Sequence, residues 1–407
     1  MINNKLILRI STYLFFVFTY IEDTLPYGQV LTFVSLALML FTVIYGHSLK
    51  LILPKSCFFT YMLSMLLYCW LSMLWAESPS LTTIAVRGIL MSSIKVYIVY
   101  VCCYHQLSTN DFLKIMMYGG YTVVIYSIMR YGWNMIMDVL AEDVRLANSA
   151  LMNTNTLGMC AAYSIVINFY YVVNEKIRIS DLLSLPTAII IAASGSRKAI
   201  LIVVAGVLLI TILKNFNGKN IVANSIKCLL GCAFVVIVLF VLLQLPIFSN
   251  IMSRLSLLST RQKNYNGIIA SDIRQVYNII GWNLFREHPF VGIGIHNASL
   301  YISMYYGHPH LHNNFIELLA CGGIVGFLIH YSFYIYLFMQ FWHMRKFRDE
   351  VFDICITLLL VRFVMGYGYI QYYSTMTYFN LMVFYMFITD RIEKYKGQEI
   401  VIDNANI

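Results

Sequence analysis

The chain has 407 residues, of which 60% are hydrophobic and only 12% are charged, and its mean hydropathy is +0.72. A soluble protein of this length could not bury so much apolar surface, and its continuous apolar runs do not resemble the short alternating strands of a membrane β-barrel. The net charge of +9 does not by itself indicate nucleic-acid binding, because excess lysine and arginine on a membrane protein marks cytoplasmic loops. We therefore predict an all-α polytopic membrane protein.

The apolar runs predict about twelve transmembrane helices, each long enough to cross roughly 30 Å of hydrocarbon. The first run, at residues 6–22, follows a basic start and lacks a small-residue cleavage site, so we expect a retained span and not a removed signal peptide. The other spans are expected at residues 28–46, 57–75, 84–104, 111–130, 156–173, 181–195, 197–213, 226–246, 314–341, 351–370 and 374–389. The seventh and eighth nearly meet at SGSRK, which predicts a tight turn.

The basic residues predict the orientation of these spans. With the N-terminus in the cytoplasm, the inner loops hold most of the lysines and arginines, whereas the outer segments EDTLPYG and AESPSLTT hold none. This asymmetry follows the positive-inside rule. Both termini are therefore expected on the cytoplasmic side of the membrane.

The expected organisation has four parts. A transmembrane bundle of about nine spans occupies residues 1–246, an extracytoplasmic loop 247–313, the last three spans 314–390, and a cytoplasmic tail 391–407. A loop of that length in a compact protein is usually functional or disordered. Its apolar residues recur at helical spacing from Asp272 to Phe285, which predicts an amphipathic helix on the membrane surface or over a cavity. Ser271 is the expected cap, and His288-Pro289 the expected end.

Two polar motifs lie among the earlier spans. In NSALMNTNTLGM, before the sixth span, asparagines such as Asn155 either cap the helix or hydrogen-bond sugar hydroxyls, and capping is the favoured interpretation. In SGSRKA, Arg197 falls at an outer turn between two apolar spans. An arginine there is costly, so it is a functional candidate, although an interfacial side chain that snorkels outward remains an alternative.

The long loop carries two further candidate groups. Arg274 lies on the predicted amphipathic helix, with Arg254, Arg261, Lys263 and Arg286 nearby. The planar fork of arginine matches diphosphate oxygens two at a time, but a basic cluster beside a membrane also suits anionic lipid headgroups.

The second group is HPHLHNN, where His308, His310 and His312 alternate. Alternate spacing suggests a metal site, but no cysteine or aspartate completes the ligand set, so we expect no metal. His312, next to Asn313 at the start of a span, is suited to orient or deprotonate a hydroxyl. The alternative is a polar histidine at the membrane interface.

Taken together, the motifs resemble the bacterial O-antigen polymerase and O-antigen ligase superfamily of membrane glycosyltransferases. The resemblance rests on NTNTLGM, on SGSR before an apolar span, and on D-x-x-R-x-x-x-x-x-x-W followed by P-F-V-G-I-G between Asp272 and Gly294. It continues with His312-Asn313 and GGIVG, and it covers roughly residues 140–340. The extra histidines of HPHLHNN depart from the family pattern, which leaves open whether His308 or His310 assists His312.

The resemblance implies that Arg197, Arg274 and His312 are the functional trio. We further expect five substrate-binding residues, which are Asn155, Arg254, Arg261, His310 and Asn313. It also implies a glycan donor on undecaprenyl diphosphate, with no cofactor and no metal. Membrane lipids and a chain-length regulator protein are further expected partners, and nucleic acid is not.

The favoured function is a polymerase that joins lipid-linked repeat units into O-antigen or capsular polysaccharide. A ligase that transfers the glycan to lipid A core or to a protein is the alternative within the family. An alternative of another class is a transporter or flippase for lipid-linked sugars. It predicts inverted repeats and ionisable residues at mid-membrane, for which Lys95 and Arg362 are the candidates.

Overall fold

The computed structural model describes residues 4–46, 56–141, 153–215, 263–265, 268–270, 272–306 and 310–405. Its elements up to residue 215 are α1 Asn4–Ile21, η1 Glu22–Thr24, α2 Gly28–Tyr45, α3 Cys57–Leu71, η2 Ser72–Leu74, α4 Pro79–Cys103, α5 Thr109–Tyr131, α6 Trp133–Ala141, α7 Thr154–Asn174, η3 Ile179–Leu183, α8 Ser184–Ser194 and α9 Arg197–Asn215. The later elements are β1 Lys263–Tyr265, β2 Ile268–Ala270, α12 Ile273–Glu287, α13 Ala298–Tyr306, α14 Asn314–His343, η5 Met344–Phe347, α15 Glu350–Met365 and α16 Thr375–Ala405.

The predicted class of helical membrane protein is confirmed. Seven helices in the described part of the chain are long and apolar enough to cross a membrane, at Gly28–Tyr45, Cys57–Leu74, Pro79–Cys103, Thr109–Tyr131, Thr154–Asn174, Arg197–Asn215 and Asn314–Phe347. The count of twelve stays a prediction, and the expected ninth span at 226–246 lies outside the described residues. One feature differs from the purely helical expectation, because β1 and β2 pair as a short antiparallel hairpin within the long loop.

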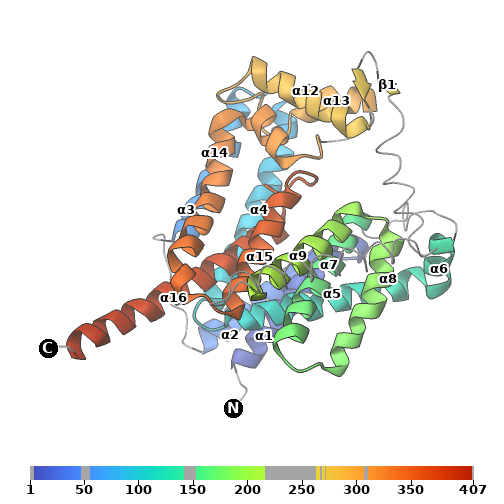
Figure 1. Ribbon diagram of the computed structural model, residues 1–407. Helices are drawn as coiled ribbons and strands as arrows, with labels where there is room; N and C mark the ends of the chain where they lie inside the picture. Colours follow the sequence, from blue (N-terminus) through green and yellow to red (C-terminus); the bar gives the residue numbers. More distant parts are fainter. Residues whose placement is uncertain are drawn as a thin grey trace.

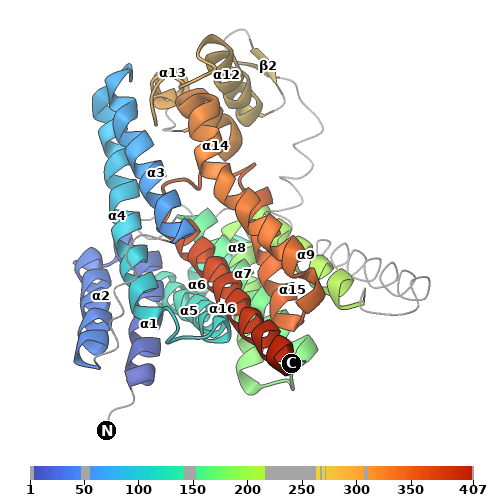
Figure 2. The same cartoon turned by 90° about the vertical axis from the view of Figure 1, so that its left-hand side faces the viewer.

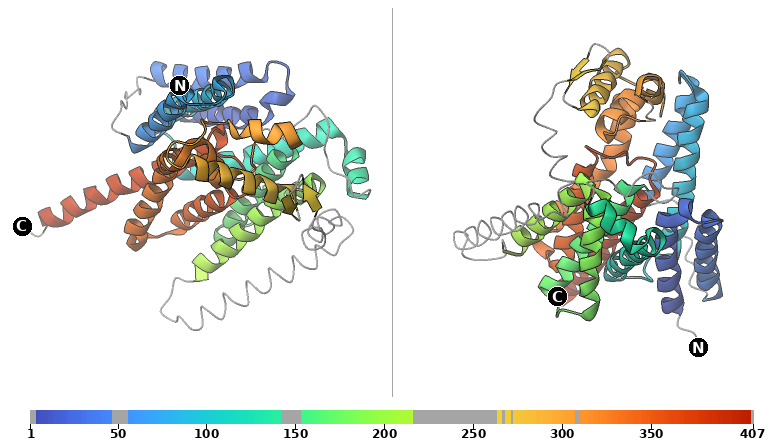
Figure 3. Two further views of the ribbon diagram at one scale, coloured as in Figure 1. Left: turned by 90° about the horizontal axis from the view of Figure 1, so that it is seen from above. Right: turned by 90° about the vertical axis from the view of Figure 1, so that its right-hand side faces the viewer.

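The described helices and strands of the long loop, β1, β2, α12 and α13, lie at one end of the molecule, opposite the N-terminus (Figure 1). There α12 and α13 lie at the upper end of α14, at the same level as the upper ends of α3 and α4, and we call this the loop end (Figure 2). Helix α7 lies at the centre of a second group, packed against α5, α8 and α9. The C-terminal part of α16 extends away from the other helices when the molecule is seen from above (Figure 3).

Helix α14 is broken near the loop end. Its backbone leaves helical geometry at Gly323, where φ is 58° and ψ is −166°. Such a break frees backbone N–H and C=O groups, which are costly to leave unpaired inside a membrane protein. Residues 289–294 pair with them, through four backbone hydrogen bonds of 2.9–3.1 Å to residues 320–325. The loop that follows α12 is therefore joined to α14 by a ladder that replaces the lost helical bonds.

Glycines on both sides allow this junction to form. A Cβ atom at Gly323 would lie 2.3 Å from the carbonyl carbon of Phe290. A Cβ atom at Gly292, where φ is +66°, would lie 2.4 Å from the carbonyl carbon of Cys321. Both positions also need a positive φ, which glycine adopts at little cost. The motifs PFVGIG and GGIVG are thus the two sides of one close backbone contact.

Side chains from α3 and α4 hold the same loop from a second direction. The Tyr68 hydroxyl donates to the carbonyl of Gly322 at 2.5 Å, next to the break. The Asn297 side chain accepts from the Ser78 N–H at 2.6 Å and donates to the Thr82 hydroxyl at 2.8 Å. These hydrogen bonds connect the loop end to the second and third of the seven helices, so α12 is attached to a fixed support.

We predict that Gly323→Ala destabilises the protein, whereas Gly88→Ala does not. Backbone strain of this kind costs about 1–3 kcal/mol, and the added methyl group would also meet the backbone of Phe290. Gly88 lies inside α4, where a Cβ atom would meet nothing closer than 3.9 Å. The measurement is the fraction of purified protein that stays monodisperse after heating. Equal heat resistance of the two variants would show that the junction does not require glycine.

Candidate functional site

Arg197 stands at the start of α9, directly after a tight turn. Helix α8 ends at Ser194, and Gly195 adopts a left-handed conformation with φ 57° and ψ 24°. The buried Ser196 donates its N–H to the Ser194 hydroxyl at 3.2 Å. The turn predicted at SGSRK is confirmed. It places the Arg197 guanidinium 3.8 Å from the carboxylate of Asp272, with each side chain about one quarter exposed (23% and 25%).

Asp272 has two roles at the start of α12. Its side chain accepts a hydrogen bond from the Arg274 N–H at 3.2 Å, which caps the helix. The same carboxylate faces Arg197 from another part of the chain. The predicted cap, Ser271, lies outside the described residues, whereas the predicted end is confirmed, with His288 as the C-cap. Asp272 therefore brings the two candidate arginines to one place.

The two arginines are electrostatically coupled. Burial lowers the pKa of Arg274 below its ordinary value, and the positive charge of Arg197 lowers that pKa further. The negative charge of Asp272 opposes this effect and raises the pKa of Arg274, although less than burial and Arg197 lower it. A bound anion would relieve the remaining repulsion, and arginine pairs are suited to the paired oxygens of a diphosphate.

The inner face of α12 carries the contact with the histidine segment. The Tyr277 ring stacks against the His312 ring, with centroids 6.1 Å apart and planes at 29°. The side chain of Asn313 donates to Asn278 at 3.3 Å. The predicted amphipathic character is confirmed, because Val276 and Tyr277 are fully buried. Tyr277 and Asn278 lie one helical turn after Arg274, on the same face of α12. This face therefore links the arginine pair to His312.

The histidine segment is fixed where α14 begins. Asn313 caps α14 by accepting from the N–H groups of Phe315 and Ile316 at 3.1 and 3.4 Å. The backbone of His312 is left-handed, with φ 58°. Its ring lies 4.7 Å from that of His310, measured between centroids. His312 is thus held in an uncommon conformation at the helix entry.

Glu317 supports this segment and was not among the predicted residues. Its buried carboxylate accepts the Leu311 N–H at 2.8 Å, directly before His312. The only signal in the sequence is a single acid in the first turn of a long apolar run, which is also the ordinary pattern of a favourable helix dipole. Only the fold shows that this acid holds the loop before it.

Other predicted residues are placed differently or not at all. Asn153 is the residue that caps α7, by accepting from the N–H of Asn155 at 2.9 Å, so the favoured interpretation of that motif is confirmed. Asn155 follows in the first turn of the helix, and its role in substrate binding stays a prediction. The expected contributors Arg254, Arg261 and His308 lie outside the described residues.

Residues 182–331 match a protein-family model described as O-antigen ligase. The resemblance predicted from the motifs is confirmed over this segment, which contains Arg197, Arg274 and His312. No curated protein matches the chain. Together with the apolar helices, the match indicates a multi-pass membrane protein with a segment that is similar to O-antigen ligases.

Substitutions at Asp272 separate its role as a cap from its charge. Asparagine caps helices about as well as aspartate, whereas alanine costs about 0.5–2 kcal/mol. We predict that Asp272→Asn keeps the thermal stability of the purified protein and that Asp272→Ala lowers it. If asparagine were as damaging as alanine, the ion pair with Arg197, and not the cap, would hold the start of α12.

Proposed function

We propose that the protein is a glycosyltransferase that joins undecaprenyl-diphosphate-linked oligosaccharide repeat units into O-antigen or capsular polysaccharide. The reaction would take place at the outer face of the bacterial inner or plasma membrane. The observation that carries the proposal is the convergence of Arg197 and Arg274 on Asp272, with His312 attached to the same helix face through Tyr277. The family match over this segment supports the same class of reaction.

The chemistry follows from the charges. An acceptor hydroxyl attacks the anomeric carbon of the donor sugar and forms the new carbon–oxygen bond. The bond from that carbon to the diphosphate oxygen breaks, and its electron pair stays on the lipid diphosphate. Arg197 and Arg274 stabilise the growing negative charge, which a preorganised donor does at little reorganisation cost. His312 accepts the hydroxyl proton, a task that suits an imidazole near neutral pH.

A ligase is the second candidate, because the matching family model carries that description. It would use the same donor and the same charged residues, with lipid A core or a protein as the acceptor. The flippase alternative has less support, since one of its candidate charges is neutralised locally. The ammonium group of Lys95 lies 2.8 Å from the Glu22 carboxylate, so this buried lysine has a structural partner.

Arg274 provides the sharpest mutational test. We predict that Arg274→Ala lowers polymer formation by roughly ten- to a hundred-fold, because a charge-assisted hydrogen bond contributes about 1.5–3 kcal/mol. Arg274→Lys should fall nearly as far, since lysine lacks the two-pronged fork. The measurement is polymer amount and length in a strain that lacks the native gene.

Arg286→Ala is the matched control for this experiment. Arg286 lies on the same helix, but it is exposed and stacks on Trp282 with its guanidinium carbon 5.8 Å from the ring. Its removal should leave polymer formation unchanged at equal protein level. Full-length polymer from Arg274→Ala would remove that arginine from the reaction.

The proposed chemistry needs no metal, because two arginines supply the positive charge at the leaving group. We therefore predict that purified protein transfers lipid-linked repeats at an undiminished rate in excess chelator. A loss of transfer that one divalent ion restores would instead assign the histidine segment to a metal.

A further inference from the structure

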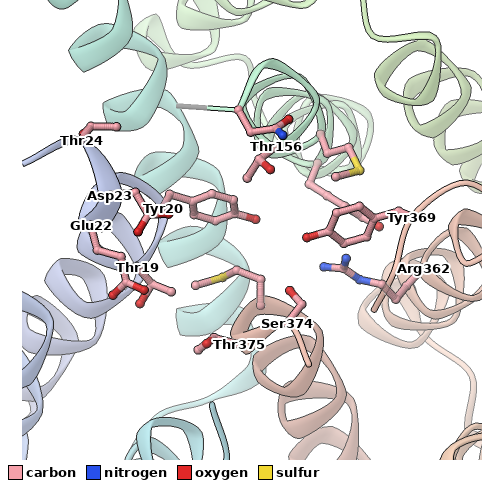
Figure 4. Close-up of a pocket in the computed structure, with 14 residues that line it drawn as sticks. Thr19, Tyr20, Glu22, Asp23, Thr24, Thr156, Arg362, Tyr369, Ser374 and Thr375 are labelled. Carbon is pink, nitrogen blue, oxygen red and sulfur yellow. The ribbon is translucent and has the colours of Figure 1, made fainter. Parts of the chain in front are cut away.

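A polar cavity of about 240 Å³ opens among α1, α7, α15 and α16. Figure 4 shows the Arg362 guanidinium directed into it beside the Tyr369 ring, with Tyr20 on the opposite wall. Asn153 and Thr156 line it from the start of α7. All these residues lie outside the segment 182–331 that matches the O-antigen ligase model. Sites for drug-sized ligands usually measure roughly 300–1,000 Å³, so this cavity suits a single small ring.

Two residues that line the cavity each have a buried polar atom that makes no hydrogen bond among the described residues. Arg362 is only 3% exposed, and its Nε atom makes no hydrogen bond within the described part of the chain. The hydroxyl of Tyr163, a residue 6% exposed, also has none there. The guanidinium carbon lies 5.0 Å from the centre of the Tyr163 ring, a cation–π contact that leaves the N–H groups free to donate. A buried donor without a partner is costly, and a ligand with oxygen atoms would satisfy it.

The charges around the cavity favour a neutral ligand. Glu22 lines the wall, but it is already paired with Lys95 at 2.8 Å and accepts the Thr32 hydroxyl at 3.1 Å. The remaining charges are the exposed Asp23 and the buried Arg362, which have opposite signs. A diphosphate would therefore meet a carboxylate as well as an arginine. Hydroxyls and aromatic rings around one guanidinium match a polyhydroxylated ring instead.

The cavity is joined to the arginine and histidine site through the segment 366–374, which connects α15 to α16. The Lys198 ammonium lies 5.6 Å from the centre of the Tyr369 ring, and Lys198 directly follows Arg197. The Asn314 side chain, two residues after His312, accepts from the N–H of Gln371 at 2.7 Å. One connecting segment thus borders the cavity and touches both sides of the proposed reaction centre.

We propose that this cavity binds one neutral sugar residue of the glycan, with Arg362 and Tyr163 as its hydrogen-bonding side chains. The proposal rests on the proposed function, because a glycan substrate is the source of such a residue. The sugar belongs either to the lipid-linked donor or to the acceptor chain. Either one would be positioned beside the reaction centre by a site outside the family segment.

The test measures sugar binding directly, without turnover. Full-length protein in lipid nanodiscs is titrated with the methyl glycosides of glucose, galactose and N-acetylglucosamine, and with inorganic pyrophosphate, by saturation-transfer NMR. At least one glycoside should bind. Tyr163→Phe should weaken that binding roughly two- to ten-fold, and Arg362→Lys should weaken it about ten-fold or more. Tyr121→Phe is the matched control, because its buried hydroxyl also lacks a partner among the described residues but does not line the cavity.

In the binding experiment, the proposal is overturned if no glycoside binds, if Tyr121→Phe weakens binding as much as Tyr163→Phe, or if Arg362→Lys weakens only pyrophosphate binding. A transfer assay then identifies the source of the sugar. A higher KM for the donor alone in Tyr163→Phe assigns the site to the donor, and a higher KM for the acceptor alone assigns it to the acceptor. Weaker glycoside binding with both KM values unchanged would also overturn the proposal. A wild-type protein that binds glycosides but transfers nothing would contradict the proposed function and leave the sugar site standing.

Discussion

The arrangement of the loop end depends on the break in α14 at Gly323. A helix that opens inside a membrane protein exposes backbone groups that hydrocarbon cannot satisfy. Here the loop at 289–294 satisfies them by running beside the break as a short ladder. This contact requires two backbones at a separation that only glycine permits. Once the loop is joined there, the end of α12 is set, and α12 packs against the start of α14.

From that position, α12 assembles charges that would otherwise repel. Arg197 comes from the start of α9 and Arg274 from α12, and the Asp272 carboxylate lies 3.8 Å from the Arg197 guanidinium. The arrangement places two guanidinium groups close to each other before any substrate arrives, which suits a site for an anion that becomes more negative during reaction. The stacking of Tyr277 on His312 then sets the distance between the charged end of α12 and the histidine.

The buried polar groups fall into two kinds. Glu317 and the Lys95–Glu22 pair have partners within the protein. These contacts offset the free-energy cost of burying their charges, so we assign them a structural role. Arg362 Nε and the Tyr163 hydroxyl lack partners in the described residues, and both residues line a cavity. This difference separates groups that stabilise the fold from groups that are available to a ligand. Glu317 and Arg362 are both isolated charged residues within apolar runs, so the sequence pattern does not distinguish the two kinds.

The sequence by itself determined the features that depend on near neighbours. Helical spans follow from the length and hydropathy of continuous runs, and the amphipathic course of α12 follows from apolar residues at helical spacing. The tight turn before Arg197 and the asparagine cap of α7 are local as well. Arg197, Arg274 and His312 were identified one by one from short motifs. Only the tertiary structure decided that Asp272 faces Arg197, that PFVGIG and GGIVG are two sides of one junction, and that Arg362 meets Tyr163 at a cavity. These contacts join segments that are far apart in the chain. A hydrophobic pattern that repeats every few residues shows which face of a helix is apolar, but it does not specify which other helix that face contacts.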